Sequence, residues 1–499
     1  MESRISVNLE KVSHAANASL YIFTIGFFLL GHFVSFYFHF GTVIFFLSVL
    51  INLYFLHGQK QHALLSNFGF LAQMRYIIES IGPEFRQYLY MSDTEERPFN
   101  RIERAEVYRK SKNMDSSSAF GSLNNFDHRE IKLRHSMFPR RKSEQSPFSV
   151  TFGEERSLSS AYAIKKPMMI SAMSYGALSS RAVRSLARGA KKAGIPMNTG
   201  EGGYPKHHLA EGCDLIFQMG TAKFGVRNDD GSLNDEKLSE IAALEQVKMI
   251  EIKLSQGAKP GKGGLLPKEK ITEEISQLRG VPMGADVISP RGHVECSSPG
   301  NTVKFIQHVQ EISGLPVGIK MCLGRADEFS NLLKEMKQQK VYPDYMVIDG
   351  SEGGTGAAPK PFMDDIGVPI YKALPFVNEL LMEYDLRDKT KLVASGKLIN
   401  AGRQFIAMSF GANAIYSARG FMLAIGCIQA MQCNSNTCPV GITSHSPKLY
   451  TGIDIEVKSE RVASYVNNIA HDHEEILASL GKGSHAELNK ENLLIPEFY

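Results

Sequence analysis

Three of the six cysteines in this 499-residue sequence, Cys427, Cys433 and Cys438, lie within a span of twelve residues that ends against Pro439. Closely spaced thiolates of this kind are typical of a metal or iron–sulfur centre rather than of a disulfide framework. A cubane cluster normally has four cysteine ligands and no fourth cysteine lies nearby, so the spacing favours a three-iron cluster or a non-cysteine fourth ligand. Zinc is the weaker interpretation, because only His445 is placed as a further ligand. Buried thiols without a metal are the remaining alternative.

The other cysteines and the net charge indicate in which compartment the protein works and which classes of partner are improbable. The other cysteines stand alone in the sequence, which favours a reducing compartment over an extracellular disulfide scaffold. The formal net charge is only +4, so no nucleic-acid or acidic partner is indicated.

Glu201 and Lys253 are the charged residues that we single out as catalytic candidates. Lys253 lies in the apolar run Met249–Leu254, where an inward-pointing ammonium group would need a partner and could stabilise an anion. Glu201 lies in the segment Thr199–Gly203, between glycines that leave its carboxylate open to act as a general base. The alternatives are a Lys253 side chain that reaches outward to water and an incidental Glu201 in a glycine-rich turn.

Glycine-rich segments that follow further apolar runs are candidate cradles for a phosphate or a cofactor. Four glycines fall within Asp349–Gly356, more than a turn requires, which indicates close backbone contact with another group. Ser395 and Gly396, like Ala418 and Arg419, follow two later apolar runs, where backbone amides and the Arg419 charge could bind a phosphate.

Apolar runs of strand length alternate with segments of helical period from Phe152 onward, the pattern of repeated βα units. Eight such runs are present, the number of strands in a closed parallel barrel. The predicted fold class is therefore α/β, a (β/α)8 TIM barrel, whose functional residues lie at the C-terminal ends of the strands. The predicted strands are Met168–Met173, Pro196–Thr199, Leu215–Thr221, Met249–Leu254, Val317–Met321, Tyr345–Asp349, Leu392–Ser395 and Ala414–Ser417.

The segment from Ala15 to His57 contains no Lys, Arg, Asp or Glu. As a helix it would reach about 60 Å, roughly twice the hydrocarbon thickness of a bilayer, so we expect two transmembrane helices in a hairpin with a break near His39–Gly41. The predicted location is the inner (cytoplasmic) membrane, in contact with lipid, and the alternative is an apolar hairpin buried against the barrel or a partner. Both ends of the hairpin and the catalytic domain are placed in the cytoplasm by the flanking basic residues Arg4, Lys11, Lys60 and Arg75.

The predicted domain organisation follows from these patterns. A membrane hairpin occupies residues 1–57, and a polar connector that packs on the barrel occupies residues 58–151. The barrel with its cysteine loop spans residues 152–446, and a C-terminal helical segment spans residues 447–499.

Five motifs, in the same order along the chain, resemble the FMN-binding domain of glutamate synthase. The run Cys-x5-Cys-x4-Cys-Pro-Val-Gly resembles the [3Fe-4S] motif of that family. The resemblance extends from about Phe152 to Ser446, so the catalytic core of the family is expected here. The other four motifs are Ser171–Ser179, Asn198–Gly203, Ile252–Gly261 and Asp349–Ala357.

The resemblance implies two cofactors, FMN and a [3Fe-4S] cluster whose ligands are Cys427, Cys433 and Cys438. It places Lys253 between the flavin and a 2-oxo acid, and Glu201 where ammonia arrives and a proton is transferred. The residues that it implies around FMN are Ala172, Met173, Ser174, Thr199, Gln218, Lys253, Lys320, Asp349, Gly350, Gly353, Gly354, Ser395, Gly396, Ala418 and Arg419.

The implied activity is that of an oxidoreductase acting on CH–NH2 groups, which reduces the imine of a 2-oxo acid and ammonia or an amine. In the family, 2-oxoglutarate and ammonia give glutamate. The chain begins Met1-Glu2-Ser3 instead of with the family's amidotransferase, so we expect a separate amidotransferase as a source of ammonia. No Gly-x-Gly-x-x-Gly follows a strand, so electrons are expected from an external donor, either a ferredoxin-like protein or an NAD(P)H-dependent partner subunit. Ser289–Glu295 replaces a Pro-rich, His-paired family segment near the substrate, so the oxo acid is left open.

Two alternative functions stay open. Another FMN barrel oxidoreductase, such as one resembling 2-hydroxy acid oxidases, would have no need of a one-electron relay at the cysteines. A non-catalytic electron-transfer subunit would have no use for Glu201 and Lys253.

Overall fold

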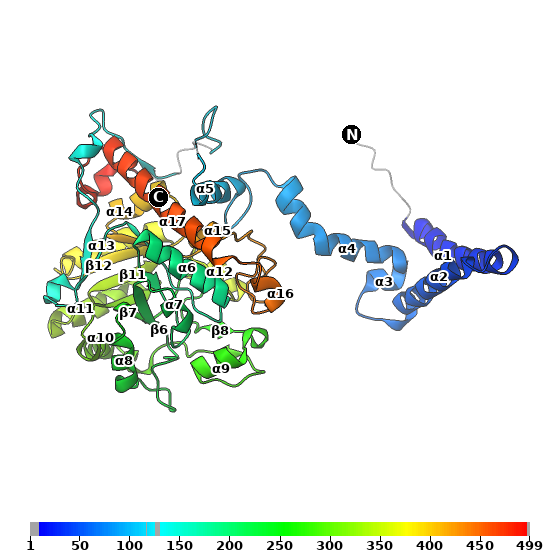
Figure 1. Cartoon of the computed structure of the whole chain (residues 1–499), viewed down its shortest axis with the longest axis horizontal. Coiled ribbons are helices and arrows are strands. Elements are labelled where there is room, and N and C mark those ends of the chain that lie inside the picture. The colour runs from blue at the N-terminus through cyan, green and yellow to red at the C-terminus, as the bar shows by residue number, and fades with distance from the viewer. Residues whose placement is uncertain (1–8, 116, 125–129, 497–499) are drawn as a thin grey trace. The chain divides into compact units, whose positions relative to one another are not determined.

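The structure is a computed structural model that describes residues 9–115, 117–124 and 130–496. Contacts divide the chain into two compact units, one up to Arg101 and the other from Ile102 onward (Figure 1). The first unit contains the predicted hairpin and residues 58–101, and the second contains the barrel and residues 102–151. Arg4, which contributed to the predicted orientation of the hairpin, lies outside the described residues.

Two apolar helices, α1 (Leu9–Phe33) and α2 (Phe38–Leu53), pack against each other in the first unit. The ring centroids of Phe23 and Phe27 both lie 5.3 Å from that of Phe45. The segments Lys11–Phe33 and Phe38–Gly58 have mean hydropathies of 1.4 and 1.9, and both are long and apolar enough to cross a membrane.

The chain reverses between these helices at residues 34–37, so the predicted break near His39–Gly41 is wrong. Val34 N and Ser35 N both donate to Leu30 O and thereby close the end of α1. Gly41 lies inside α2, because an isolated glycine within an apolar helix lowers its stability without ending it.

Two further helices complete the first unit, α3 (Ala63–Phe68) and α4 (Phe70–Phe85). Asn52 of α2 is buried, and its Oδ1 accepts a hydrogen bond from Phe70 N at 2.6 Å. The Ser13 hydroxyl of α1 donates to Phe68 O at 3.0 Å. These buried polar contacts hold the start of α4 against the apolar pair. One-turn π-helices follow α2 at Tyr54–Gly58 and α4 at Arg86–Tyr90.

The second unit contains a closed barrel of eight parallel strands, which confirms the predicted fold class and all eight predicted strands. The strands pair in the order in which they occur along the chain, and the eighth strand closes the ring against the first. They are β4 (Met168–Ile170), β5 (Met197–Asn198), β6 (Leu215–Met219), β7 (Val247–Lys253), β10 (Val317–Met321), β11 (Tyr345–Asp349), β12 (Lys391–Ser395) and β13 (Ala414–Ser417).

Helices surround this barrel, and local polar side chains cap the N-termini of several of them. Ser179, for example, accepts a hydrogen bond from Ala182 N at the start of α6. The long C-terminal helix α17 packs along α6 (Figure 1). The helices of this unit are α5 (Arg101–Ser111), α6 (Ser180–Ala193), α7 (Lys206–Leu209), α8 (Asp235–Ala242), α9 (Glu273–Arg279), α10 (Pro299–Ser313), α11 (Ala326–Gln339), α12 (Lys360–Asp365), α13 (Ile370–Glu383), α14 (Ala401–Ser409), α15 (Arg419–Ala424), α16 (Pro447–Tyr450) and α17 (Ile455–Ser479).

Short antiparallel pairs lie outside the barrel sheet. β8 (Leu265–Leu266) and β9 (Val287–Ile288) pair within the insertion after β7, and this insertion also carries α9. β1 (Lys132–Leu133) pairs with β14 (Leu493–Leu494), which ties the segment before the barrel to the end of the described chain. β2 (Val150–Phe152) pairs with β3 (Tyr162–Ile164) directly before the first barrel strand.

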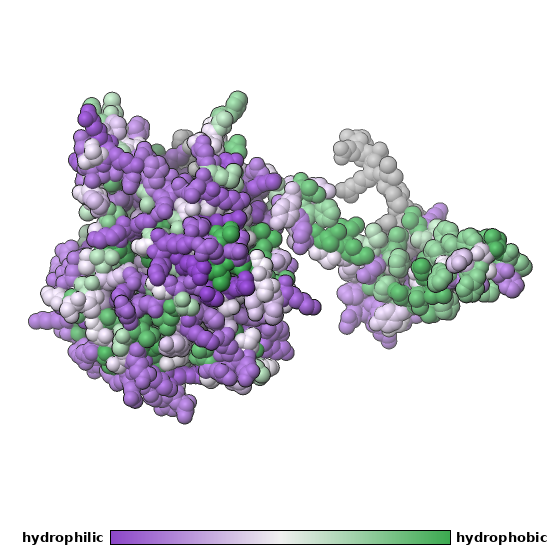
Figure 2. Space-filling view, in the orientation of Figure 1, coloured by the Kyte–Doolittle hydropathy of each residue, from purple (hydrophilic) through white to green (hydrophobic). Residues whose placement is uncertain are grey.

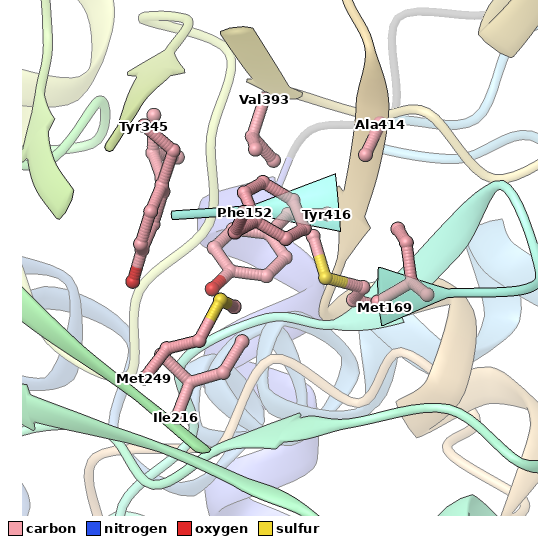
Figure 3. Packing of buried hydrophobic residues seen from close by; sticks show 10 residues of the cluster. Phe152, Met169, Ile216, Met249, Tyr345, Val393, Ala414 and Tyr416 are labelled. Atoms are coloured by element: carbon pink, nitrogen blue, oxygen red, sulfur yellow. The ribbon is translucent and has the colours of Figure 1, made fainter. Parts of the chain in front are cut away.

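The apolar core at the N-terminal end of the barrel includes side chains from this β2–β3 pair. Phe152 and Ile164 pack with Met169, Ile216 and Met249 and with residues from the later strands (Figure 3). The Phe152 ring meets the Tyr345 ring edge to face, with centroids 5.3 Å apart. Strand residues that point into a barrel must fill it, so this end is a packed core and not a pore.

Phe152→Ala should lower the free energy of unfolding by about 3–5 kcal/mol, because it leaves a cavity among fully buried side chains. Denaturant titration of the purified protein, followed by circular dichroism, measures this loss. Phe120→Ala is the matched control, since Phe120 is fully exposed and its loss should change stability by no more than about 0.5 kcal/mol. Equal effects of the two substitutions would contradict the packing described here.

Candidate active site

The inward-pointing side chains of β7 change from apolar to polar to charged along the strand. Alternate side chains of a barrel strand point inward, so Met249, Glu251 and Lys253 follow one another toward the C-terminal end. Met249 belongs to the apolar core, Glu251 is fully buried among polar groups, and Lys253 is 8% exposed. Charged side chains therefore gather at the end of the barrel where functional residues are expected.

Glu251 accepts three hydrogen bonds inside the barrel. Its Oε1 accepts from Gln218 Nε2 at 2.6 Å and from Asn198 Nδ2 at 3.0 Å, and its Oε2 accepts from the Tyr416 hydroxyl at 3.0 Å. Burial raises the pKa of Glu251, while the Lys320 charge and these hydrogen bonds oppose the rise. The contact orients the amide of Gln218, which was predicted at the flavin, and sequence analysis did not identify Glu251 as its support.

The two predicted catalytic residues form a direct ion pair. Lys253 Nζ donates to Glu201 Oε1 and to Gln256 Oε1, each at 2.6 Å. A side chain at Gly220 would clash with the Glu201 carboxylate, and a Cβ at Gly264 would lie 2.9 Å from Glu201 Oε1. Close packing of glycine backbone thus holds this carboxylate against the lysine.

More positive charge surrounds Glu201 than sequence analysis predicted. Burial alone would raise the pKa of Glu201, but the charges of Lys253, Arg279 and Lys259 outweigh burial and lower it. Burial, together with the Lys253 charge, lowers the pKa of Lys259 to about 8. Burial also lowers the pKa of Arg279 to about 10, at the end of α9. Lys259 lies within the recognised motif Ile252–Gly261 and was overlooked, whereas nothing in the local sequence singles out Arg279.

A second lysine and carboxylate lie beside this pair. Lys320 occupies the position next to Lys253 on the neighbouring strand, and its Nζ lies 3.7 Å from Asp349 Oδ2. The same carboxylate oxygen accepts from Gly257 N at 2.9 Å. A side chain on Gly257 would clash with the backbone carbonyl of Gly350. Part of the close contact predicted for Asp349–Gly356 is therefore made with the chain itself.

The predicted phosphate residues meet around Glu352. Arg419 Nη2 donates to Glu352 O at 2.6 Å, and a Cβ on Gly354 would lie 2.7 Å from Arg419 Nε. Gly396 has φ +142°, and a Cβ there would lie 3.1 Å from the Glu352 carboxylate. Burial lowers the pKa of Arg419 to about 10. These contacts bring together the segments that follow β11, β12 and β13. Gly353 precedes Gly354, Ser395 ends β12, and Ala418 is the N-cap residue of α15.

The segments after β4 and β5 form the adjoining part of the rim. A Cβ on Gly200 would lie 2.6 Å from Ser174 N, so the two segments touch through their backbones. The Thr199 hydroxyl oxygen accepts from Gln218 N at 3.1 Å. The ring nitrogen Nε2 of His208 lies 3.1 Å from the backbone oxygen of Met173, the residue that follows Ala172 in the chain. The predicted flavin residues of these two segments are thus neighbours at one end of the barrel.

The cysteine loop follows α15 and contacts segments outside the barrel. The Tyr108 hydroxyl of α5 donates to Cys427 O at 2.6 Å. Lys270 Nζ donates to Cys433 O at 3.2 Å and to Ala177 O at 2.6 Å. Gln429, Met431 and Asn436 all have positive φ, so the backbone of this loop is tightly turned.

The electrostatics of this loop fit an anionic iron–sulfur cluster. Burial raises the pKa of Cys427 to about 11, and the charges of Cys433 and Cys438 add to the rise, so the three thiols lie near one another. Buried Arg104 opposes the rise at Cys427, and buried Lys270 does so at Cys433.

Over the described residues, no three His, Cys, Asp or Glu side chains are close enough together to hold a single metal ion. Ligands of a polynuclear cluster bind different iron atoms and lie farther apart than the ligands of one ion. The described residues therefore offer no site for a single zinc ion.

The segment Ser289–Glu295 forms a wall next to the ion pair. His293 Nε2 lies 3.0 Å from Lys253 O, and the Thr221 hydroxyl donates to Pro290 O at 2.7 Å. Fully buried Lys223 forms an ion pair with Glu295 at 2.9 Å. The segment that departs from the resembled family thus contacts the backbone of the central lysine.

Comparisons with known proteins agree with this arrangement. A protein from Bacillus subtilis (strain 168), described as glutamate synthase large subunit-like protein YerD, is 35% identical over 87% of this chain and 90% of its own length. The archaeal-type glutamate synthase [NADPH] of Thermotoga neapolitana is 36% identical over 64% of this chain, which covers 60% of that protein. The archaeal glutamate synthase [NADPH] of Methanocaldococcus jannaschii is also 36% identical, over 64% of this chain and 59% of its own length.

A whole family also matches most of the chain. The family described as conserved region in glutamate synthase matches residues 100–483, which include the barrel, the cysteine loop and the long helix α17. With its closed barrel and its relatives, the chain belongs to the glutamate synthase family.

Proposed function

We propose that the chain is an FMN- and iron–sulfur-dependent oxidoreductase of glutamate synthase type that reduces the imine of a 2-oxo acid. The substrates proposed are 2-oxoglutarate and ammonia, and the product is glutamate. The observation that carries the proposal is the ion pair between half-buried Glu201 and buried Lys253, with two more cations, Lys259 and Arg279, acting on the same carboxylate. A site with one acid and three cations suits a substrate that carries carboxylates and also needs a proton acceptor.

The residues at the mouth of the barrel fit FMN. Gly354 leaves room beside the Arg419 side chain, as a phosphate site requires, because a Cβ there would lie 2.7 Å from Arg419 Nε. Gln218, oriented by Glu251, would hold the pyrimidine edge, and Lys253 or Lys320 would supply positive charge. When bound there, FMN would supply the hydride for the imine carbon.

The chain's own residues account for the remaining chemistry. Lys259 and Arg279 would bind the carboxylates of the oxo acid, since both are buried cations near Glu201. Glu201 would accept a proton from the attacking ammonia nitrogen, because its lowered pKa keeps it ionised at neutral pH. Formation of the imine releases water, and its reduction consumes one hydride and one proton.

The cysteine loop would bring in the electrons. Cys427, Cys433 and Cys438 would hold a [3Fe-4S] cluster, which supplies one-electron transfer when bound. An external donor, a ferredoxin-like protein or an NAD(P)H-dependent subunit, would reduce it, and the NADPH in the names of two relatives favours the second. A separate amidotransferase would supply ammonia.

The first unit would anchor this enzyme to the inner membrane, with the barrel in the cytoplasm. The length and apolar character of α1 and α2 support two spans, and α2 returns the chain to the side from which α1 started. Their buried fractions within the structure are only 6% and 11%, unlike those of core helices in a soluble protein.

Reduced protein supplied with 2-oxoglutarate and ammonium should reoxidise anaerobically and accumulate glutamate. Lys253→Ala should lower kcat/KM by about 100-fold or more through lost charge stabilisation. Glu201→Gln should lower it by about 100- to 10,000-fold through loss of the base. Lys248→Ala, on the same strand outside the ion pair, is the control. The proposal would be overturned if the protein oxidised 2-hydroxy acids instead, or if no combination of oxo acid and amine reoxidised the reduced protein.

The value of kcat/KM for 2-oxoglutarate should fall as pH rises through about 8. Lys259 is charged below that pKa and loses its proton above it, so carboxylate binding weakens on the alkaline side. Lys259→Arg should remove this decline, since arginine stays charged over the whole range. A decline near pH 8 that persists in Lys259→Arg would assign it to another group.

Cys433→Ser should remove most of the iron while the protein keeps its flavin, because the cysteine loop lies beyond α15, whereas the phosphate residues lie directly after the ends of β11, β12 and β13. Iron and flavin per chain, measured on the purified protein, separate the two effects. Cys296→Ser, outside the loop, should keep both. Undiminished iron in Cys433→Ser would rule out the cluster assignment.

A further inference from the structure

Helix α4 (Phe70–Phe85) has an exposed apolar face along its whole length. At 100° per residue, its apolar residues fall within an arc of about 120° that contains no polar residue. Figure 2 shows hydrophobic residues along this helix. Six residues of the arc are at least 40% exposed: Phe70, Met74, Ile77, Ile78, Ile81 and Phe85.

The opposite side of α4 is polar and electrically balanced. Arg75 and Glu79 lie there, followed by Glu84 near its edge and by Arg86 directly after the helix. Two arginines balance two glutamates, so attraction to anionic groups cannot be the main source of binding. Burial of the apolar arc would have to supply it.

Only the start of α4 is packed within the first unit. The helix contacts α1 and α3, Ala72 is buried, and Phe70 N is bonded to Asn52. Beyond Ala72 the apolar arc is exposed through Phe85. A monomeric soluble domain rarely leaves a continuous apolar strip of this length in water.

We propose that α4 lies in the headgroup region of a lipid bilayer, with its apolar arc toward the acyl chains. The occupant is lipid because α4 belongs to the same compact unit as α1 and α2, the two helices long enough to span a membrane, and contacts α1 directly. Tyr88 and Tyr90, 50% and 76% exposed just after α4, are residues that favour the membrane interface. The inference rests on the proposed anchoring and adds a surface-lying segment to it.

The absence of tryptophan from the chain permits a direct test with single-tryptophan variants. Ile78→Trp places the probe within the apolar arc, and Glu79→Trp places it one residue away on the polar side. Ile25→Trp in α1 reports separately on the proposed span. The full-length protein would be reconstituted into phosphatidylcholine liposomes with and without bromine-labelled acyl chains, and tryptophan quenching would be measured.

The proposal expects Ile78→Trp to be quenched at least about twofold more strongly than Glu79→Trp, and most strongly by bromine near the headgroups. Added anionic lipid should change this little, since the polar side is balanced.

An unquenched, blue-shifted Ile78→Trp would overturn the proposal and show that protein, either the barrel or a second copy, covers the arc. Equal quenching at positions 78 and 79 would overturn it as well. The Ile25→Trp variant tests the membrane span separately from the surface helix. If Ile25→Trp is quenched and Ile78→Trp is not, the proposed membrane anchor stands and the proposed surface position of α4 is wrong. If Ile25→Trp is unquenched, the anchor fails, and α4 is still judged by the difference between positions 78 and 79.

Discussion

Closure of the eight-stranded barrel is the constraint on which the other features depend. A closed parallel sheet turns alternate side chains of each strand into a space that has to be filled. On β7 this alternation turns Met249, Glu251 and Lys253 inward in succession. The same rule places Tyr416 on β13 within reach of Glu251. The depth of each residue in the barrel decides its role: Met249 packs in the apolar core, Glu251 orients neighbouring polar side chains, and Lys253 is a candidate for catalysis.

Charge compensation at the mouth of the barrel depends on that geometry. A lysine buried at the end of a strand is costly unless a carboxylate pairs with it, and Glu201 and Asp349 meet this need for Lys253 and Lys320. Cations dominate the environment of Glu201, because their charges lower its pKa although partial burial opposes this. Such an excess of positive charge is a natural binding place for an anionic ligand.

Segments outside the barrel support the cysteine loop. Helix α5 contributes Tyr108, and the insertion after β7 contributes Lys270. The same insertion carries Arg279 toward Glu201. One insertion therefore supplies cations both to the cysteine loop and to the ion pair, which couples the position of the proposed cluster to that of the proposed substrate site.

The sequence by itself determined the elements. Strands buried on both faces of a parallel barrel read as short apolar runs, so all eight could be identified along the chain. The charge-free segment before residue 58 likewise identified two apolar helices, although Gly41 was taken for the break that lies at residues 34–37. Periodicity and composition are local properties, and they determine local structure well.

Tertiary structure alone decided which side chains meet. Glu251 looked like an ordinary strand residue, and its role as the acceptor for Gln218 and Asn198 depends on strands that close around it. Arg279 lies 78 positions from Glu201 in the sequence and acts on its charge only because the insertion folds back over the barrel mouth. The reason is physical: electrostatic and hydrogen-bond partners are chosen by distance in space, which chain closure sets and sequence spacing does not.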